Sequence, residues 1–215
     1  MPGFDVSKFH QLGKKIVGAG LNYKSLLKEK GFPEPKEPVI FVKPTSTYLL
    51  EGSPIIIPKG YDVFNEIELG VIIGRKGKDI RAEEATRYIG GYCLALDLTA
   101  MNILNEHRKE GLPWLVSKGF DTATPISAPV PAACLPDPPA ARLWCCVDGR
   151  LRQDDRICGM IFSIPRQLAF MSKNMTLEPY DLILTGSPAG VGPIKQGNVI
   201  QGGLEDILSI NFNVC

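Results

Sequence analysis

Short apolar runs separated by glycine- and proline-containing turns dominate the pattern of hydrophobic and polar positions along this chain. Runs of this kind are typical of buried strands. We expect strands at 15–20, 39–42, 55–57, 66–74, 92–96, 142–147, 150–153, 182–184 and 208–214. Helical spacing is limited to a lead-in at 4–13 and to segments at 24–30, 82–88, 100–110 and 163–173. Because strands and helices do not alternate regularly, the pattern predicts an α+β fold built on a mixed sheet or β-roll.

Glycines and potential capping residues set the expected ends of the helices. Gly31 and Gly111 follow the second and fourth helical segments, and glycine commonly ends a helix. Asp79 is expected to start the third segment and Thr99 to cap the fourth, because short polar side chains accept hydrogen bonds from the first helical N–H groups. Gly90 is expected to break the third segment before the next strand.

One predicted strand carries two carboxylates on the same face. It begins at Glu66 and ends at Gly74, and Glu66 and Glu68 lie two residues apart. Residues two apart in a strand share a face, so the apolar residues between and after the glutamates point the other way, toward a core. Two neighbouring carboxylates beside an apolar run are costly unless a cation neutralises them. A divalent metal ion is one such cation.

A third carboxylate comes from Asp97, which directly follows the apolar run at 92–96. Three carboxylates without a histidine or cysteine partner suit Mg²⁺, Mn²⁺ or Ca²⁺ rather than Zn²⁺. Alternating glutamates on a strand also occur as an ordinary solvated face. At this point both interpretations stay open.

Two further stretches offer groups that could bind a small anion. Residues 185–192 follow an apolar strand and present backbone N–H groups, although they lack the pattern of a nucleotide phosphate loop. A tight turn is the alternative interpretation. Lys118 lies in a predicted loop at 112–120, where its ammonium could neutralise a substrate carboxylate or could simply be solvated.

Composition narrows the classes of function. The chain has 215 residues, 44% of them hydrophobic, and a formal net charge of +1. This length fits one domain spanning 1–215, and the charge gives no basic surplus for nucleic acid. With only two histidines, a zinc hydrolase or a Ser-His-Asp enzyme is disfavoured. No run approaches the ~20 apolar residues that span a membrane.

The six cysteines form no CxxC pair. We interpret them as reduced thiols, and therefore expect an intracellular compartment, mitochondrial or cytoplasmic.

Taken together, the spaced motifs resemble the fumarylacetoacetate hydrolase family, in particular its small single-domain acylpyruvate hydrolase and oxaloacetate decarboxylase members. The matching stretches are 20–23, 38–44, 66–74, 90–100, 111–114 with Lys118, 160–165 and 184–193. They follow one another over nearly the whole chain, from about residue 13 to 214. The resemblance implies a mixed β-roll or β-sandwich core of the C-terminal-domain type, a few short helices, and a homodimer.

The resemblance also implies Mg²⁺ or Mn²⁺ held by Glu66, Glu68 and Asp97. Family members act on a C–C bond next to a 2-oxo acid, and the metal stabilises the pyruvate enolate that forms. Hydrolysis of an acylpyruvate, decarboxylation of oxaloacetate and keto–enol tautomerisation all use such a site.

Roles for four other residues follow from the same resemblance. Lys118 would hold the developing oxyanion or carboxylate, and Thr185 and Gly186 would contact the substrate carboxylate. Glu29 would share proton transfer or water activation on a lid.

This chain departs from its relatives near that lid. Leu26 stands where close relatives carry a histidine, three residues before the glutamate position, and Leu21 stands where an arginine is common. Met101 and Leu104 stand where relatives usually carry arginine and glutamine. General acid–base catalysis typically raises a reaction rate by about 10²–10⁴-fold, and Leu26 cannot contribute to it. We therefore expect decarboxylation or tautomerisation of oxaloacetate to be favoured over hydrolysis, and a non-catalytic, metal-dependent binder of 2-oxo acids is a further alternative.

Overall fold

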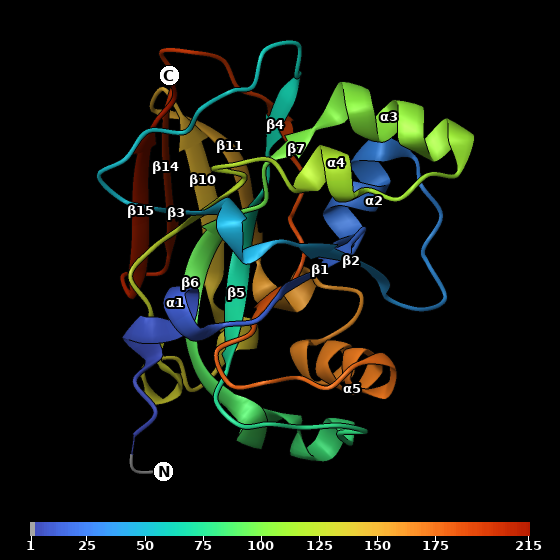
Figure 1. The fold of residues 1–215 in the computed structure, drawn as a ribbon, viewed down its shortest axis with the longest axis vertical. Coiled ribbons are helices and arrows are strands. Elements are labelled where there is room, and N and C mark those ends of the chain that lie inside the picture. Colours follow the sequence, from blue (N-terminus) through green and yellow to red (C-terminus); the bar gives the residue numbers. More distant parts are fainter. Residues whose placement is uncertain (1–2) are drawn as a thin grey trace.

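The computed structural model describes residues 3–215 and contains three β-sheets with short helices around them (Figure 1). The largest sheet has eight strands, which are β1 (Ile16–Gly20), β2 (Val39–Lys43), β3 (Tyr48–Leu50), β5 (Ile67–Ile73), β6 (Ile89–Leu96), β8 (Thr124–Ile126), β9 (Val130–Pro131) and β12 (Leu182–Leu184). They are ordered β2-β1-β12-β5-β6-β8-β3, with β9 paired to β6. The pairs β1–β12 and β3–β8 are parallel and the others antiparallel, so the predicted α+β fold with a mixed sheet is confirmed.

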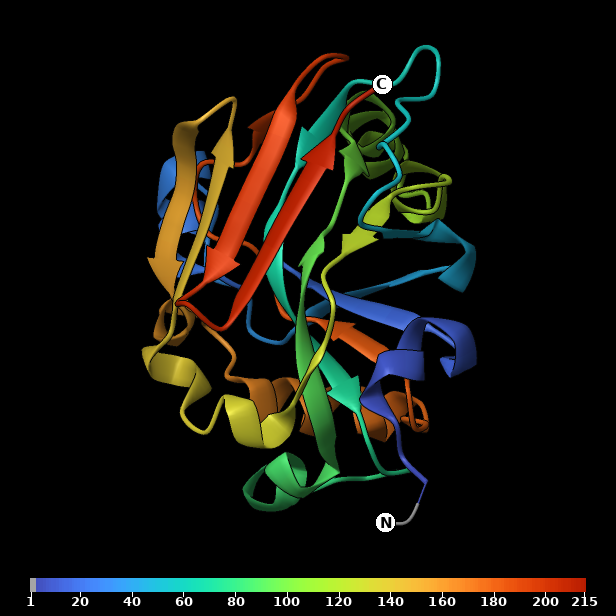
Figure 2. The same cartoon turned by 90° about the vertical axis from the view of Figure 1, so that its left-hand side faces the viewer.

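A second, antiparallel sheet of four strands covers one face of the first. Its order is β11-β10-β14-β15, formed by β10 (Arg142–Val147), β11 (Arg150–Arg156), β14 (Val199–Leu204) and β15 (Leu208–Asn213). Figure 2 shows this sheet in front of β5 and β6. A small third sheet joins β13 (Gly192–Pro193), β4 (Val63–Asn65) and β7 (Thr99–Ala100). The two larger sheets therefore enclose the core as stacked layers.

The alternation of side chains along β5 separates the core from the site. Ile67, Leu69, Val71 and Ile73 belong to the main hydrophobic core, which also contains the buried apolar residues of β10, β14 and β15. Glu68 points away from that core, toward the other carboxylates of the site. The predicted division of this strand into an apolar face and a carboxylate face is confirmed.

Short helices lie around the sheets (Figure 1). They are α1 (Phe9–Leu12), α2 (Lys24–Lys30), α3 (Met101–Glu110), α4 (Leu115–Lys118) and α5 (Ile164–Asn174). Gly31 and Gly111 end α2 and α3 in the left-handed conformation, with φ of +67° and +71°, as predicted. Among residues 3–215, no helix combines the length and the apolar character that a membrane crossing requires.

Several predicted boundaries were wrong. The helical segment at 82–88 has the expected bounds but is a 3₁₀ helix, and the residue before it is Arg81 rather than the predicted Asp79, which has φ of +52°. Gly90 does not end that segment but lies inside β6, which already begins at Ile89. A Cβ on Gly74 would lie 2.6 Å from the Cα of Gly90, so these glycines allow two neighbouring strands to approach closely.

Other differences concern elements whose partners are distant in sequence. The strand expected at 55–57 is reduced to one bridge between Ile55 and Val214. Thr99 does not cap α3 but pairs in β7, and Ala100 precedes the helix. The loop expected at 112–120 contains α4, which ends at Lys118.

Candidate metal centre

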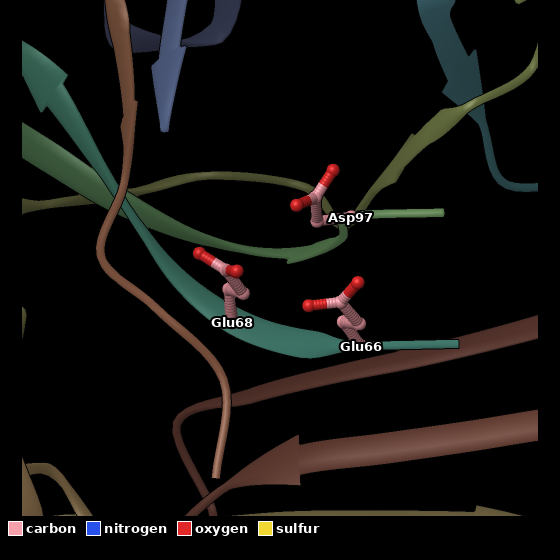
Figure 3. A group of neighbouring side chains, drawn as sticks. All are labelled: Glu66, Glu68 and Asp97. Carbon is pink, nitrogen blue, oxygen red and sulfur yellow. The ribbon is translucent and has the colours of Figure 1, made fainter. Parts of the chain in front are cut away.

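Three carboxylates meet where β5 and β6 lie side by side (Figure 3). Ile67 pairs with Leu96 in the antiparallel register, and the backbone N–H of Asp97 donates to the carbonyl of Glu66 at 2.8 Å. This register places the side chain of Asp97 beside Glu66 and Glu68. One oxygen from each carboxylate lies within 4.8 Å of the others. The predicted convergence of the three acids is therefore present in the fold.

Two lysine ammonium groups face Asp97, which is only 1% exposed. Lys43 donates to Asp97 Oδ1 at 2.7 Å and to the carbonyl of Ala123 at 2.6 Å. Lys118 pairs with Asp97 Oδ2. Burial raises the pKa of Asp97, but the two ammonium charges and their hydrogen bonds outweigh it and hold that pKa below its ordinary value.

Glu66 lies at the more open side of the cluster. Its Oε1 accepts a hydrogen bond from Thr99 and lies 3.2 Å from the ammonium of Lys118. Lys118 also donates to Thr99 Oγ1 at 2.6 Å. Burial lowers the pKa of Lys118, but Asp97 and Glu66 outweigh it and raise this pKa to about 12. Lys118 thus carries its proton throughout the neutral pH range.

Glu68 is the least compensated of the three acids. Its side chain is 2% exposed, and one oxygen accepts the backbone N–H of Gly186 at 2.6 Å. Burial, followed by the charges of Asp97 and Glu66, raises the pKa of Glu68 well above its ordinary value. An additional positive charge near Glu68 would offset both effects.

The donor set fits a hard divalent cation. Lys43 and Lys118 supply two positive charges to three carboxylates, so one negative charge is left uncompensated within the cluster. All the converging donors are oxygens, which Mg²⁺ and Mn²⁺ prefer. Glu66, Glu68 and Asp97 are the residues that would hold such an ion.

Buried amides fix the backbone around the carboxylates. Gln153 accepts from the N–H of Ile67 at 3.0 Å and donates to Ser187 Oγ at 2.8 Å, which joins the start of β5 to the loop after β12. Asn22 donates to the carbonyl of Thr185 at 2.8 Å. Gly186 has φ of +106°, a conformation that glycine adopts readily, and this turn aims its N–H at Glu68. The site is therefore held by rigid strands and a braced loop.

A pocket of about 340 Å³ opens beside the carboxylates. Glu66 and Lys118 lie in its wall, and this volume falls in the range of small-molecule sites. The remaining lining is mostly apolar and comes mainly from α2, α3, β2, the end of β1 and the segment before α4. All four positions at which the resemblance led us to expect other residues line this pocket, and all four carry apolar side chains, namely Leu21, Leu26, Met101 and Leu104.

Three residues predicted to act on the substrate lie outside the lining of this pocket. Glu29 accepts the N–H of Gly190 at 2.6 Å and pairs with Lys30 at 2.7 Å, so it fastens α2 to the loop after β12. Thr185 is buried, and its hydroxyl donates to the carbonyl of Leu69 at 2.7 Å. Gly186 contacts Glu68 as described above. Their roles toward substrate stay predictions.

Sequence reasoning missed two members of the charge network and one wall of the pocket. Lys43 ends an apolar strand before a proline, and a lysine in that position is a weak signal of a buried partner. Thr99 looks locally like a helix cap. The aromatic wall formed by Phe41 and Trp114, whose ring centroids are 6.0 Å apart, joins residues too distant in sequence to be recognised as neighbours.

A larger pocket of about 580 Å³ lies elsewhere, between the proline-rich segment 135–139 and the start of α5. It contains none of the three carboxylates and is mostly apolar. Volume alone therefore does not identify the site, whereas the converging charges do.

Comparison with known sequences gives a consistent result. Residues 15–214 match the family described as fumarylacetoacetate (FAA) hydrolase C-terminal. The chain is 45% identical over 210 residues to a mitochondrial oxaloacetate tautomerase of Mus musculus, covering 97% of this chain and 95% of that protein. It is 47% identical over 201 residues to a mitochondrial oxaloacetate decarboxylase of Dictyostelium discoideum, covering 93% and 92%.

Solved structures show the same fold. A fumarylpyruvate hydrolase from Pseudomonas aeruginosa, in complex with Mn²⁺ and pyruvate, superposes with a TM-score of 0.89 at 32% identity, covering 94% of this chain and 89% of that one. A 5-carboxymethyl-2-hydroxymuconate delta-isomerase from Mycobacterium smegmatis gives 0.84 at 35% identity, covering 94% and 79%. These similarities agree with the arrangement of sheets and with the predicted β-roll.

Proposed function

Because this chain belongs to the fumarylacetoacetate hydrolase family, we propose that it is a Mg²⁺- or Mn²⁺-dependent enzyme that decarboxylates or tautomerises oxaloacetate. Processing of 2-oxo acids is common to the named relatives, whereas the metal and the individual reaction are our proposals for this chain. The observation that carries them is the cluster of Glu66, Glu68 and Asp97 at the wall of a ligand-sized pocket.

Each charged group has a separate part in this reaction. A bound divalent cation would supply Lewis-acid stabilisation of negative charge on the 2-oxo oxygen. Lys118 contributes a permanently protonated ammonium at the same end of the pocket, where it can hold a substrate carboxylate. Lys43 keeps Asp97 ionised and in place from the side away from the pocket.

Decarboxylation fits the apolar lining. The second carboxylate of oxaloacetate lies two carbons from its 2-oxo group, so it would fall among Leu26, Met101 and Leu104 when the 2-oxo acid end lies at Lys118. An apolar environment disfavours a carboxylate relative to neutral CO₂. The C–C bond then breaks with its electron pair left on the pyruvate fragment, and a proton adds to that carbon.

Hydrolysis of an acylpyruvate is less well supported. It needs a group that activates water, and Leu26 cannot do so. Glu29 is occupied by the N–H of Gly190 and by Lys30. Acylpyruvate hydrolysis therefore becomes a minor activity in this proposal.

Tautomerisation is the second candidate, and the Mus musculus relative named as a tautomerase favours it. It moves a proton between carbon and oxygen without loss of CO₂. Lys118 is a proton-bearing group that lines the pocket at the carboxylate cluster.

A mitochondrial location is also part of this proposal, because the Mus musculus and Dictyostelium discoideum relatives are named as mitochondrial proteins. A homodimer stays a prediction, to be measured by light scattering.

The test is to incubate the protein with oxaloacetate and Mg²⁺ while recording enol absorbance and CO₂ release separately. We expect turnover that chelation with EDTA abolishes and that added Mg²⁺ or Mn²⁺ restores, because the cation supplies several kcal/mol of charge stabilisation. CO₂ release identifies a decarboxylase, and loss of enol without CO₂ identifies a tautomerase.

Two results would contradict the proposal. Turnover that survives complete metal removal would exclude the metal-dependent reaction. Tight Mg²⁺-dependent binding of oxalate without turnover of any 2-oxo acid would identify a non-catalytic binder instead.

A further inference from the structure

The ammonium of Lys118 has all three of its N–H groups engaged within the carboxylate cluster. They donate to Asp97 Oδ2, to Glu66 Oε1 at 3.2 Å and to Thr99 Oγ1 at 2.6 Å. A lysine ammonium has three donors and no acceptor, so this set is complete. Two of the three acceptors belong to carboxylates of the candidate metal centre. Thr99 is the third acceptor and the only neutral one.

The direction of each hydrogen bond at Thr99 follows from the charges around it. Because Lys118 can only donate, Oγ1 of Thr99 must accept from it. The single hydroxyl proton then goes to Glu66 Oε1, which lies closer than the alternative acceptor, the carbonyl of Asp97 at 3.3 Å. Thr99 therefore presents a lone pair to the ammonium and a proton to the carboxylate.

The backbone around Thr99 holds this hydroxyl in place. Thr99 is fully buried and pairs with Phe64 in the antiparallel register of β7 and β4. The N–H of the preceding residue, Leu98, donates to the carbonyl of Ala123 at 3.0 Å. A β-branched side chain in a strand also has few rotamers to choose from. The position of Oγ1 is therefore set by the sheet and not by Lys118 or Glu66.

A bound cation would affect the three acceptors of Lys118 differently. A divalent cation held by Glu66 and Asp97 would share their oxygens with the ammonium, and two positive charges at short range in a buried site repel each other. Thr99 carries no charge, and its lone pair stays directed at Lys118. The Phe41 ring lies 4.6 Å from the same ammonium and adds a second contact that does not involve a carboxylate.

From this arrangement we infer that Thr99 is a positioning residue, which keeps the ammonium of Lys118 at the pocket wall when a divalent cation occupies Glu66 and Asp97. Thr99 thereby sets the affinity of the metal-loaded site for the carboxylate of its ligand. The inference rests on the proposed function, in which Lys118 holds a substrate carboxylate. It adds a residue whose hydroxyl acts through Lys118 without touching the substrate.

The test measures binding of oxalate by calorimetry at saturating Mg²⁺, after each variant has been titrated with Mg²⁺ alone. Thr99→Val keeps the β-branched shape and removes both hydrogen bonds. We expect it to weaken oxalate binding about 10- to 100-fold, the range for a hydrogen bond to a charged group. Thr99→Ser restores the hydroxyl and should bind oxalate within about threefold of wild type. If Thr99→Val does not fold, Thr99→Ala replaces it with the same expectation.

Two further variants separate positioning from a loss of structure. Thr124→Val is the matched control, because Thr124 is another fully buried threonine in a strand, and its hydroxyl bonds to Thr47 at 2.8 Å. It should lower the melting temperature to a similar extent and leave oxalate affinity unchanged. In a Lys118→Met background, Thr99→Val should change oxalate affinity by less than about threefold, because its effect requires the ammonium.

The outcomes distinguish this inference from the proposed function, which is judged by turnover of oxaloacetate in wild type. Oxalate binding by Thr99→Val that equals wild type would overturn the inference while the proposed function stands. An equal loss in Thr99→Ser, or a full loss that persists in the Lys118→Met background, would do the same. Wild type that neither bound oxalate with Mg²⁺ nor turned over oxaloacetate would contradict both.

Discussion

Replacing Glu68 with glutamine is expected to lower kcat/KM for oxaloacetate by about 10³-fold or more, and to weaken Mg²⁺ binding in parallel. The reason is that Glu68→Gln removes one of three anionic donors and with it much of the charge stabilisation that a divalent cation supplies, which is worth several kcal/mol. The substitution keeps the side-chain length and the oxygen that accepts the N–H of Gly186. The measurements are steady-state kinetics and calorimetric titration with Mg²⁺.

The metal-free stability of the same variant separates loss of metal from loss of fold. Glu68 is buried beside two other carboxylates and has a raised pKa, so its charge is unfavourable in the metal-free protein. Glu68→Gln should therefore unfold in EDTA at the same temperature as wild type or a higher one. Glu83→Gln, at an exposed position, is the control and should change neither binding nor activity. A variant of Glu68 that kept its activity would show that this residue is not a metal ligand.

Replacing Lys43 with methionine is expected to destabilise the protein by about 3–5 kcal/mol, the usual penalty for removing one partner of a buried ion pair. Lys43 is fully buried and contacts Asp97 and the carbonyl of Ala123. Methionine fills a similar volume, so the loss of stability measures the contribution of the charge and the hydrogen bonds of Lys43. Urea denaturation of the metal-free protein provides the free energy of unfolding.

Two further variants identify the cause of that loss. Adding Asp97→Asn to Lys43→Met removes the carboxylate that has lost one of its two ammonium partners and should recover part of the stability. Arg142→Leu breaks an exposed ion pair with Asp154 and should cost less than about 1 kcal/mol. If Lys43→Met cost no more than Arg142→Leu, the buried pair would not be a major support of the site.

The sequence was sufficient where the decisive pattern is local. The carboxylate face of β5 follows from the two-residue period of a strand, and Gly31 and Gly111 end their helices for a local steric reason. The resemblance in the order of the motifs then identified Asp97 as the third carboxylate of the cluster with Glu66 and Glu68. Family membership and the layered α+β fold could also be predicted, because the motifs and apolar runs that indicate them are local in sequence.

The sequence was insufficient where the partner lies far along the chain. Lys43 and Asp97 are separated by 54 residues, and nothing in the local pattern distinguishes this lysine from one in solvent. The assignment of Thr99 as a cap used a correct local rule, but pairing in β7 and the hydrogen bond to Glu66 decided its place. Strand β14 was missed because Gly202 and Gly203 weaken its strand pattern. They are needed there because a Cβ on Gly203 would lie 2.6 Å from the side chain of Trp144.

Three positions at which the resemblance led us to expect polar residues lie together in the fold. Leu26, Met101 and Leu104 are distant or separate in sequence, but all three line the pocket beside the carboxylates with apolar side chains.

Anomalous diffraction from crystals grown with Mn²⁺ and oxalate tests the metal site most directly. We expect a manganese peak bonded to one oxygen from each of Glu66, Glu68 and Asp97, with oxalate on its open side toward Lys118. An anomalous map without a peak among these three carboxylates, at a Mn²⁺ concentration that supports turnover, would contradict the proposed metal site.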